Sequence, residues 1–204
     1  MLNLLLPILL VPGAYLIGSI SFAIVVARIA NLQDPRQIGS GNPGATNMLR
    51  LGSRWAALFT LLGDLLKGTL AVVVTSLLTQ DPRILAAVVL AVFLGHLYPI
   101  YFGFKGGKGV ATALGAYLAL NPWLALAMVL TWATVAWTLR YSSLAALVTT
   151  AASPFYIWWL LKDPIYLAMG LILALIMFWR HRSNIRNLLQ GTETRIGAGK
   201  STTG

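Results

Sequence analysis

Long apolar runs alternate with short polar segments along almost the whole chain. A membrane-spanning helix needs about 20 mostly apolar residues, and five runs come close to this length: 4–27, 55–79, 84–102, 122–139 and 142–161. A sixth run, 164–179, is shorter but strongly apolar. The pattern predicts an all-α, polytopic integral membrane protein.

Residues 109–120 form a further apolar run whose length leaves two interpretations open. At a rise of about 1.5 Å per residue it spans about 18 Å, whereas the apolar core of a bilayer is about 30 Å thick. The run either crosses as a short helix, which gives seven spans, or re-enters on the same side, which gives six.

The positions of the basic residues favour seven spans. The chain carries 15 Lys and Arg against 5 Asp and Glu, a net charge of +10. With seven spans, twelve of the cations fall on one side, and only Arg83 and Lys162 fall on the other. Cytoplasmic loops are rich in Lys and Arg. We therefore expect an N-terminus outside and a cytoplasmic C-terminus. The positive-inside rule then accounts for most of the net charge.

Composition narrows the class further. Hydrophobic residues make up 58% of the chain and charged residues only 10%, which is typical of a membrane protein. Cysteine is absent, so a cysteine nucleophile, a disulfide and a thiolate metal site are excluded. The first run lacks the charged n-region and the cleavage site of a signal peptide, so we interpret it as a membrane helix. Residues 1–195 are expected to form one domain, and 196–204 a disordered tail.

The polar segment GSGNPGATNMLR, residues 39–50, predicts a short helix. Asn42 followed by Pro43 is typical of a helix N-cap and first residue. The helix would place Thr46, Asn47 and Arg50 on one face. The glycines and Ser40 before it would leave backbone N–H groups free, which favours anion binding. The alternative is an ordinary capped interfacial helix.

The segment GFKGGKGVAT, residues 103–112, combines four glycines with Lys105 and Lys108. It departs from the P-loop pattern at Phe102 and Gly109, so it does not predict that kind of ATP site. A flexible backbone, two lysines and a following helix start still favour a phosphate cradle. The alternative is a cytoplasmic turn whose lysines only follow the topology rule.

The segment RHRSNIRNLLQGTE, residues 180–193, follows the last apolar run. In a continued helix, His181 and Asn184 would share a face and point back toward the membrane. Two histidines cannot form a zinc site alone, so no metal is expected. The other histidine, His96, is interpreted as structural. Asp64 and Lys67, three residues apart within a span, are expected to pair with each other, although a functional role is the alternative.

The three segments together contain cations, amides and hydroxyls but hardly any carboxylate. Acid–base catalysis by paired carboxylates is therefore disfavoured, and so is a Ser-His-Asp triad. Two phosphate groups about 4 Å apart repel each other by roughly 4 kcal/mol per pair of unit charges at an effective dielectric constant near 20. A site this cationic is suited to holding them together.

The three segments resemble the three cytoplasmic motifs of the bacterial PlsY family of membrane acyltransferases, in the same order. The resemblance covers the chain up to about residue 195. It implies transfer of a fatty acyl group from acyl phosphate to the sn-1 hydroxyl of glycerol 3-phosphate, giving 1-acylglycerol 3-phosphate (lysophosphatidic acid) and phosphate in phospholipid biosynthesis. It also implies a place in the inner membrane, no cofactor, and a soluble partner enzyme that makes acyl phosphate.

Position by position, the resemblance implies five catalytic residues: Ser40, Arg50, Lys108, His181 and Asn184. Around them it suggests a phosphate-binding set of Gly41, Asn42, Thr46, Asn47, Lys105, Gly106, Gly107, Gly109, Thr112 and Glu193. The acceptor of the hydroxyl proton is either neutral His181 or a phosphate oxygen of a substrate. Two other functions remain possible from the residues alone: a membrane transporter of an organic phosphate and a lipid-binding scaffold.

Overall fold

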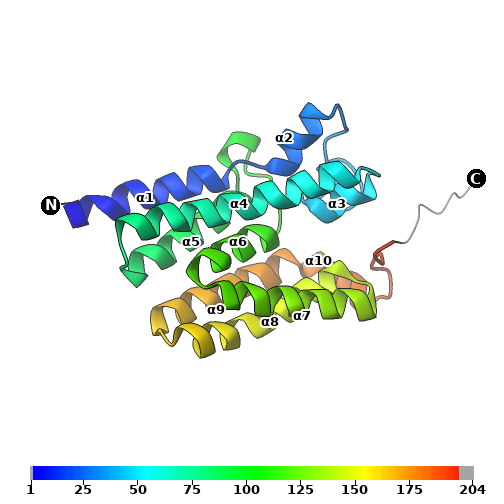
Figure 1. The fold of residues 1–204 in the computed structure, drawn as a ribbon. Coiled ribbons are helices and arrows are strands. Elements are labelled where there is room, and N and C mark those ends of the chain that lie inside the picture. Colours follow the sequence, from blue (N-terminus) through cyan, green and yellow to red (C-terminus); the bar gives the residue numbers. More distant parts are fainter. Residues whose placement is uncertain (1, 198–204) are drawn as a thin grey trace, which may run out of the picture.

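The computed structural model describes residues 2–197, and all regular elements in that part of the chain are helical (Figure 1). They are α1 (Leu2–Gly18), α2 (Phe22–Ile29), α3 (Ala45–Arg50), α4 (Arg54–Leu78), α5 (Pro82–Leu97), the 3-10 turn η1 (Ile100–Phe102), α6 (Val110–Leu120), α7 (Pro122–Leu139), α8 (Ser142–Leu161), α9 (Pro164–Arg180) and α10 (Arg182–Leu189). The all-α, polytopic prediction is confirmed.

Four helical stretches are long and apolar enough to cross a membrane: α4, α7, α8, and α5 together with η1 (Pro82–Phe102). Two bent pairs of helices are also long and apolar enough to cross a membrane if each pair counts as one span. They are α1 with α2, bent by 44°, and α9 with α10, bent by 58°. The apolar helix α6 is shorter, with 11 residues. Six candidate spans and α6 thus match the seven predicted runs, while the crossing of α6 and the orientation in the membrane stay predictions.

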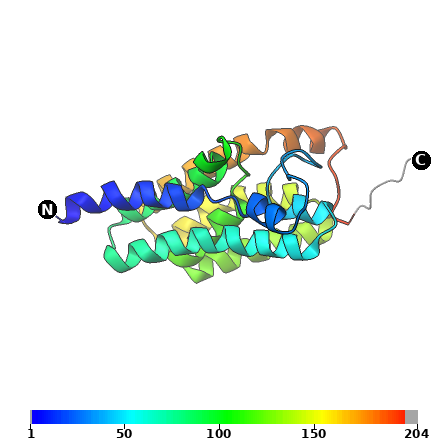
Figure 2. The ribbon, with the colours of Figure 1, turned by 90° about the horizontal axis from the view of Figure 1, so that it is seen from above.

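The long helices run roughly parallel and alternate in direction (Figures 1 and 2). The tight turns before α5, α7 and α9 lie at one end, and α3 and α10 lie at the other. Each of these three helices begins with an Asp or Asn cap followed by proline. Asp81, Asn121 and Asp163 each accept a backbone N–H through a side-chain oxygen, at 2.7–2.8 Å. Caps of this kind satisfy N–H groups that a helix start leaves free.

Glycines allow two pairs of helices to approach closely. Gly18 of α1 faces the backbone of Val92 in α5, and Gly95 of α5 faces the backbone of Tyr15 in α1. In the same reciprocal way, Gly68 of α4 faces Thr112 of α6, and Gly115 of α6 faces Leu65 of α4. Small residues at helix contacts are typical of membrane proteins, where packing drives association. These contacts fix α6, and with it the loop that precedes it.

Three local expectations were wrong. The first span is not continuous, because α1 ends at Gly18 and α2 begins at Phe22. The short helix α3 begins at Ala45 with Gly44 as its N-cap, so Asn42 and Pro43 lie in the preceding loop. The last span does not continue straight through the third polar segment, because the chain bends at His181 between α9 and α10.

The predicted tail falls mostly outside the described residues, which end at residue 197. Within the described part, the backbone N–H of Ile196 donates to the carbonyl of Arg140 (2.6 Å), and the Arg140 guanidinium donates to the carbonyl of Ile196 (3.0 Å). The segment after α10 therefore returns to the turn between α7 and α8.

We predict that Gly115→Ala destabilises the protein by about 1–3 kcal/mol, the usual cost of overpacking. A Cβ at this position would collide with the carbonyl oxygen of Leu65. The control is Gly13→Ala in α1, where a Cβ meets nothing within 4 Å, so its effect should stay within about 0.5 kcal/mol. Thermal unfolding of the purified variants in detergent measures both, and equal transition temperatures would contradict the proposed packing.

Candidate active site

Two cavities open at the end of the bundle that holds α3 and α10. The first, of about 370 Å³, is lined mainly by apolar side chains, among them Leu61, Leu114, Met128, Val129, Trp132 and Ala146. The second, of about 350 Å³, is lined by Ser40, Gly41, Asn42, Gly106, Lys108, Arg180, Arg182, Ser183 and Arg186. Ser40, Asn42 and Lys108 line both cavities. An apolar space and a cationic space therefore meet at these three residues.

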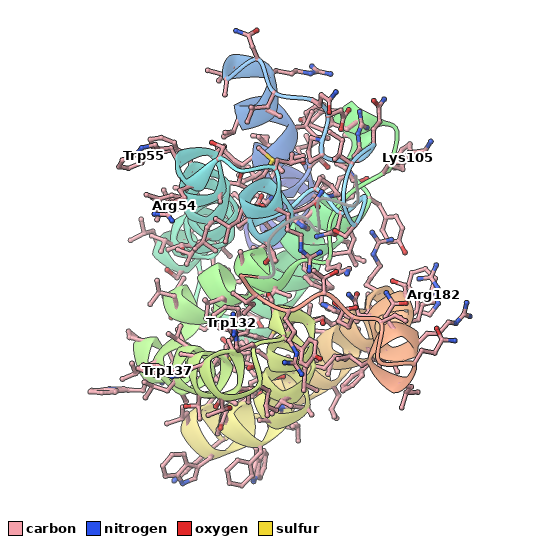
Figure 3. The ribbon with its side chains drawn as sticks, turned by 90° about the vertical axis from the view of Figure 1, so that its right-hand side faces the viewer. Arg54, Trp55, Lys105, Trp132, Trp137 and Arg182 are labelled. Atoms are coloured by element: carbon pink, nitrogen blue, oxygen red, sulfur yellow. The ribbon has the colours of Figure 1, made fainter. Side chains whose placement is uncertain are left out.

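Figure 3 views the molecule from this end. Trp132 of α7 lies toward the helices, whereas Trp137, later in the same helix, points outward and is 87% exposed. Lys105 projects from the glycine-rich loop, and Arg182 projects from α10. Lys105 is exposed and lines neither cavity, unlike Lys108 three residues later.

The loop before α3 is held in place by Asn47. Its side-chain Nδ2 donates to the carbonyls of Pro35 (2.8 Å) and Ile38 (3.0 Å), and its Oδ1 accepts from the backbone N–H of Ser40 (3.1 Å). Gly39 and Gly41 both adopt positive φ, which glycine tolerates without strain. Both side-chain N–H groups of Asn47 thus donate to the loop backbone, and phosphate binding by Asn47 stays a prediction. Its contacts place Ser40 at the junction of the cavities.

The glycine-rich loop, residues 103–109, is held by Arg180 at the end of α9. One guanidinium nitrogen donates to the carbonyls of Gly106 (2.9 Å) and Gly107 (2.8 Å). Gly109, at φ +85°, is the N-cap of α6, as expected of a helix start just beyond the lysines. Lys108 reaches across to α10, where its ammonium donates to Asn184 Oδ1.

Asn184 is oriented in turn by Glu193. The Asn184 Nδ2 group donates to Glu193 Oε1 (2.9 Å), which also accepts from Ser143 Oγ (2.7 Å) at the start of α8. Ser143, Asn184 and Glu193 are all buried. The chain of contacts from Ser143 to Lys108 therefore fixes the lysine ammonium, while Arg180 holds the backbone before it.

His181 lies at the bend between α9 and α10 and is buried. Its Nδ1 lies 2.8 Å from the carbonyl of Met177. A carbonyl only accepts, so Nδ1 carries the hydrogen and Nε2 keeps a free lone pair. Arg50 of α3 lines the same cavity, and its guanidinium lies 3.4 Å from the carbonyl of Thr194.

Burial and mutual repulsion of the cations tune both titratable groups at the junction. Burial lowers the pKa of Lys108 to about 8; Glu193 opposes this effect, and Arg50 and Arg180 add to it. Burial and the neighbouring Lys108 lower the pKa of His181 to about 4. At neutral pH, Lys108 is thus mainly a cation that loses its proton under mildly basic conditions, and His181 is neutral.

Asp64 and Lys67 form the expected ion pair, with 2.8 Å between Oδ1 and Nζ. His96, predicted to be structural, packs against the same pair, with 2.9 Å between its Nδ1 and Lys67 Nζ. Asp64 and His96 also line the first cavity. Among residues 2–197, no three His, Cys, Asp or Glu side chains are grouped as a metal site would require.

The comparisons with known proteins agree along nearly the whole chain. The family model described as glycerol-3-phosphate acyltransferase matches residues 8–191. The chain belongs to the glycerol-3-phosphate acyltransferase family. It is 55% identical to the glycerol-3-phosphate acyltransferase of Thioalkalivibrio sulfidiphilus, over 95% of this chain and 96% of the relative. It is also 55% identical to that of Halorhodospira halophila, over 97% of this chain and 100% of the relative.

Two solved structures share the fold of this family member. The crystal structure of PlsY, an integral membrane glycerol 3-phosphate acyltransferase, in its glycerol 3-phosphate form has a TM-score of 0.90 and 38% identity, covering 94% of this chain and 96% of the other. Its lysophosphatidic acid form has a TM-score of 0.86 at the same identity, covering 94% and 95%. The predicted membrane acyltransferase and the resemblance to PlsY are confirmed.

The acyltransferase fold brings most of the predicted site residues together. All five predicted catalytic residues line the first cavity, as do Asn42, Thr46, Asn47, Gly109 and Glu193. Gly41 and Gly106 line the second cavity. Lys105, Gly107 and Thr112 line neither. Thr112 is fully buried beneath the loop, where its hydroxyl lies 3.2 Å from His96 Nδ1, so it is out of reach of a phosphate.

Sequence reasoning missed several residues that shape the site. Arg180, Arg182 and Arg186 were counted only as topology cations, although they line the second cavity. Their spacing around a helix end carries no motif, and the bend at His181 is what gathers them. Ser143 was also missed, because its contact with Glu193 joins segments fifty residues apart.

We predict that Glu193→Gln lowers the pKa of Lys108 below about 8, because the carboxylate that favours the ammonium is lost. The glutamine oxygen can still accept from Ser143 and Asn184, so the geometry should persist. The pH dependence of chemical labelling of Lys108, read by peptide mass spectrometry, measures the shift. Asp163→Asn, which removes one negative charge at the opposite end while keeping the helix cap, should leave this pKa unchanged; equal shifts in both variants would contradict the prediction.

Proposed function

We propose that the protein transfers a fatty acyl group from acyl phosphate to the sn-1 hydroxyl of glycerol 3-phosphate. The products are 1-acylglycerol 3-phosphate and inorganic phosphate, and the reaction is an early step of phospholipid biosynthesis. The observation that carries this proposal is the meeting of an apolar and a cationic cavity at Ser40, Asn42 and Lys108. A reaction between a lipid chain and a small phosphate ester needs both environments at one point.

The first cavity is suited to the acyl chain. Its deep walls are apolar side chains of α4, α6, α7 and α8, and its mouth carries Arg50, Lys108 and His181. Each methylene removed from water contributes about 0.8 kcal/mol. A long chain can therefore anchor the donor with its phosphate at the cationic mouth.

The second cavity is suited to a phosphate. Arg180, Arg182, Arg186 and Lys108 line it without an acidic neighbour among its lining residues. Within the described part of the chain, the buried Arg180 Nε has no protein partner, although a buried donor usually has one. A phosphate oxygen of glycerol 3-phosphate would provide one. Two arginines on α10 and one at the end of α9 would together balance the negative charge of that phosphate.

The comparisons support the substrate and the product. PlsY structures are described in forms with glycerol 3-phosphate and with lysophosphatidic acid, and PlsY shares 38% of its sequence with this chain. Acyl phosphate as donor rests on the resemblance of the three polar segments to the PlsY motifs. It also suits a site whose cations outnumber its acids, because both the donor and the departing group are phosphates.

The reaction forms one ester bond and breaks one anhydride bond. The sn-1 hydroxyl oxygen attacks the acyl carbonyl carbon, the bond from that carbon to the phosphate oxygen breaks, and the hydroxyl proton leaves. Lys108 and Arg50 stabilise the negative charge that grows on the leaving phosphate. Ser40 and Asn184 orient the reactants at the junction of the two cavities.

The pKa values favour a substrate phosphate as proton acceptor. His181 holds a free lone pair at Nε2, but its pKa of about 4 makes it a weak base. A phosphate monoester has a second pKa of about 6 and is therefore the stronger base by about 2 units, or about 2.7 kcal/mol. We assign neutral His181 to positioning the bound substrate, and Glu193 to positioning Asn184 instead of binding phosphate.

The cation-rich end of the bundle also sets the proposed location. Under the positive-inside rule this end faces the cytoplasm of a bacterial inner membrane. Glycerol 3-phosphate would enter from that side, and a soluble enzyme that makes acyl phosphate would deliver the donor there.

We predict that the purified, detergent-solubilised protein incorporates labelled glycerol 3-phosphate into lipid with palmitoyl phosphate and not with palmitoyl-CoA. Product from palmitoyl-CoA alone would overturn the proposed donor. Lys108→Ala should lower kcat/KM by about 100-fold or more, since one charged donor to a transition state is worth about 2.7–4 kcal/mol. Lys105→Ala, on the same loop but outside both cavities, is the matched control and should retain activity.

We predict that kcat/KM for glycerol 3-phosphate falls above pH about 8 and below pH about 6. The fall on the basic limb of this pH profile results from loss of the Lys108 proton. The fall on the acidic limb results from protonation of the substrate phosphate. His181→Asn should lower turnover by less than about 100-fold and leave the acidic limb in place. An acidic limb near pH 4 in the native enzyme that disappears in this variant would identify His181 as the base instead.

A further inference from the structure

A buried polar cluster lies beneath the glycine-rich loop, and the proposed reaction does not use it directly. Lys67 of α4 is its centre: its ammonium lies 2.8 Å from Asp64 Oδ1, 2.7 Å from the carbonyl of Ile20 and 2.9 Å from His96 Nδ1. Asp64, Lys67 and His96 are 3%, 3% and 6% exposed. The contacts with Ile20 and His96 are hydrogen bonds, and the contact with Asp64 is an ion pair.

The contacts define the state of His96. Lys67 as an ammonium only donates, so Nδ1 of His96 accepts and its hydrogen is on Nε2. The charges of Asp64 and Lys67 then balance, whereas a protonated His96 would leave one buried cation unpaired. Thr112 Oγ1, at 3.2 Å from the same nitrogen, further restricts the ring.

The oriented ring supports the loop. A Cβ at Gly107 would collide with His96 Nε2, and a Cβ at Gly106 with the carbonyl of His96, so the loop backbone rests on both. The backbone N–H of Gly107 donates to the same carbonyl (3.1 Å). Arg180 binds the carbonyls of Gly106 and Gly107. The backbone directly before Lys108 is therefore fixed by His96 and by Arg180.

We propose that Asp64, Lys67 and His96 act as positioning residues that hold the glycine-rich loop so that Lys108 reaches the junction of the two cavities. The inference rests on the proposed role of Lys108. Asp64 and Lys67 orient the His96 ring, the ring supports Gly107, and Gly107 precedes the lysine.

If the Asp64–Lys67 ion pair only stabilises the fold, its removal should have a different effect than if the pair positions His96. Replacing a buried ion pair by neutral side chains of similar volume is often neutral or stabilising, whereas removing one partner alone is strongly destabilising. A pair that only stabilised the fold would thus be dispensable in the double variant Asp64→Asn/Lys67→Met. A pair that orients His96 would not be.

The test measures kcat, KM for glycerol 3-phosphate, the pH profile and the unfolding temperature of Asp64→Asn/Lys67→Met. We expect a folded protein whose kcat/KM is at least tenfold lower. The pKa of Lys108 should rise from about 8 toward its ordinary value as the displaced loop becomes less buried. The fall of kcat/KM on the basic side of the pH profile should then occur at a higher pH. Glu193, Arg50, Arg180 and His181, the charged or titratable groups near Lys108, are unchanged in this variant.

The matched control is Thr75→Val, which removes another buried polar side chain from α4. Within residues 2–197, the one hydrogen bond of the Thr75 hydroxyl goes to the carbonyl of Ala71 in its own helix. It should keep native kinetics and the native pH profile.

His96→Asn is the second variant, because an amide oxygen can still accept from Lys67 while the contact with Gly107 is lost. It should show the same kinetic loss and the same upward shift of the basic limb. Native kinetics in either variant, in a preparation where Lys108→Ala is inactive, would overturn the positioning role. If Lys108→Ala were instead fully active, the proposed function of Lys108 would fail, whatever the cluster variants did.

Discussion

Backbone groups that leave regular helix structure inside a membrane protein need partners within the protein, because lipid offers none. Around this site, polar side chains bind the backbone of three irregular segments. Lys67 binds the carbonyl of Ile20 at the break in the first span. Arg180 binds two carbonyls of the glycine-rich loop, and Asn47 binds three backbone groups before α3. The positions of Ser40 and Lys108 depend on these contacts.

This constraint explains why a site with so few acids is still well ordered. Backbone carbonyls accept from its arginines, and the side-chain amide of Asn184, which Glu193 orients, accepts from Lys108. Lys108 is held and destabilised at the same time. Its ammonium donates to Asn184, which in turn donates to Glu193, while the positive charges of Arg50 and Arg180 repel it. A bound phosphate would relieve that repulsion. This arrangement would preorganise the proposed site for phosphate before any substrate enters.

The sequence was sufficient for what depends on local pattern. Apolar run lengths predicted the helices, and the cation distribution predicted which ends lie together. The three polar segments supplied the five candidate catalytic residues, all of which line the first cavity. It was insufficient where distant segments meet. Asn42–Pro43 has the local form of a cap, yet Gly44 begins α3. The contacts of His96 with Lys67, and of Ser143 with Glu193, join different helices and leave no periodic signal.

The central claim is that separate apolar and cationic cavities hold the two substrates and meet at Lys108. Photo-crosslinking with a non-transferable phosphonate analogue of palmitoyl phosphate that carries a diazirine on its chain tests it most directly, with adducts mapped by mass spectrometry. The account predicts adducts on cavity residues such as Met128 and Trp132, which unlabelled palmitoyl phosphate removes and glycerol 3-phosphate does not. Adducts confined to the exposed Trp137, or displacement of the probe by glycerol 3-phosphate, would contradict it.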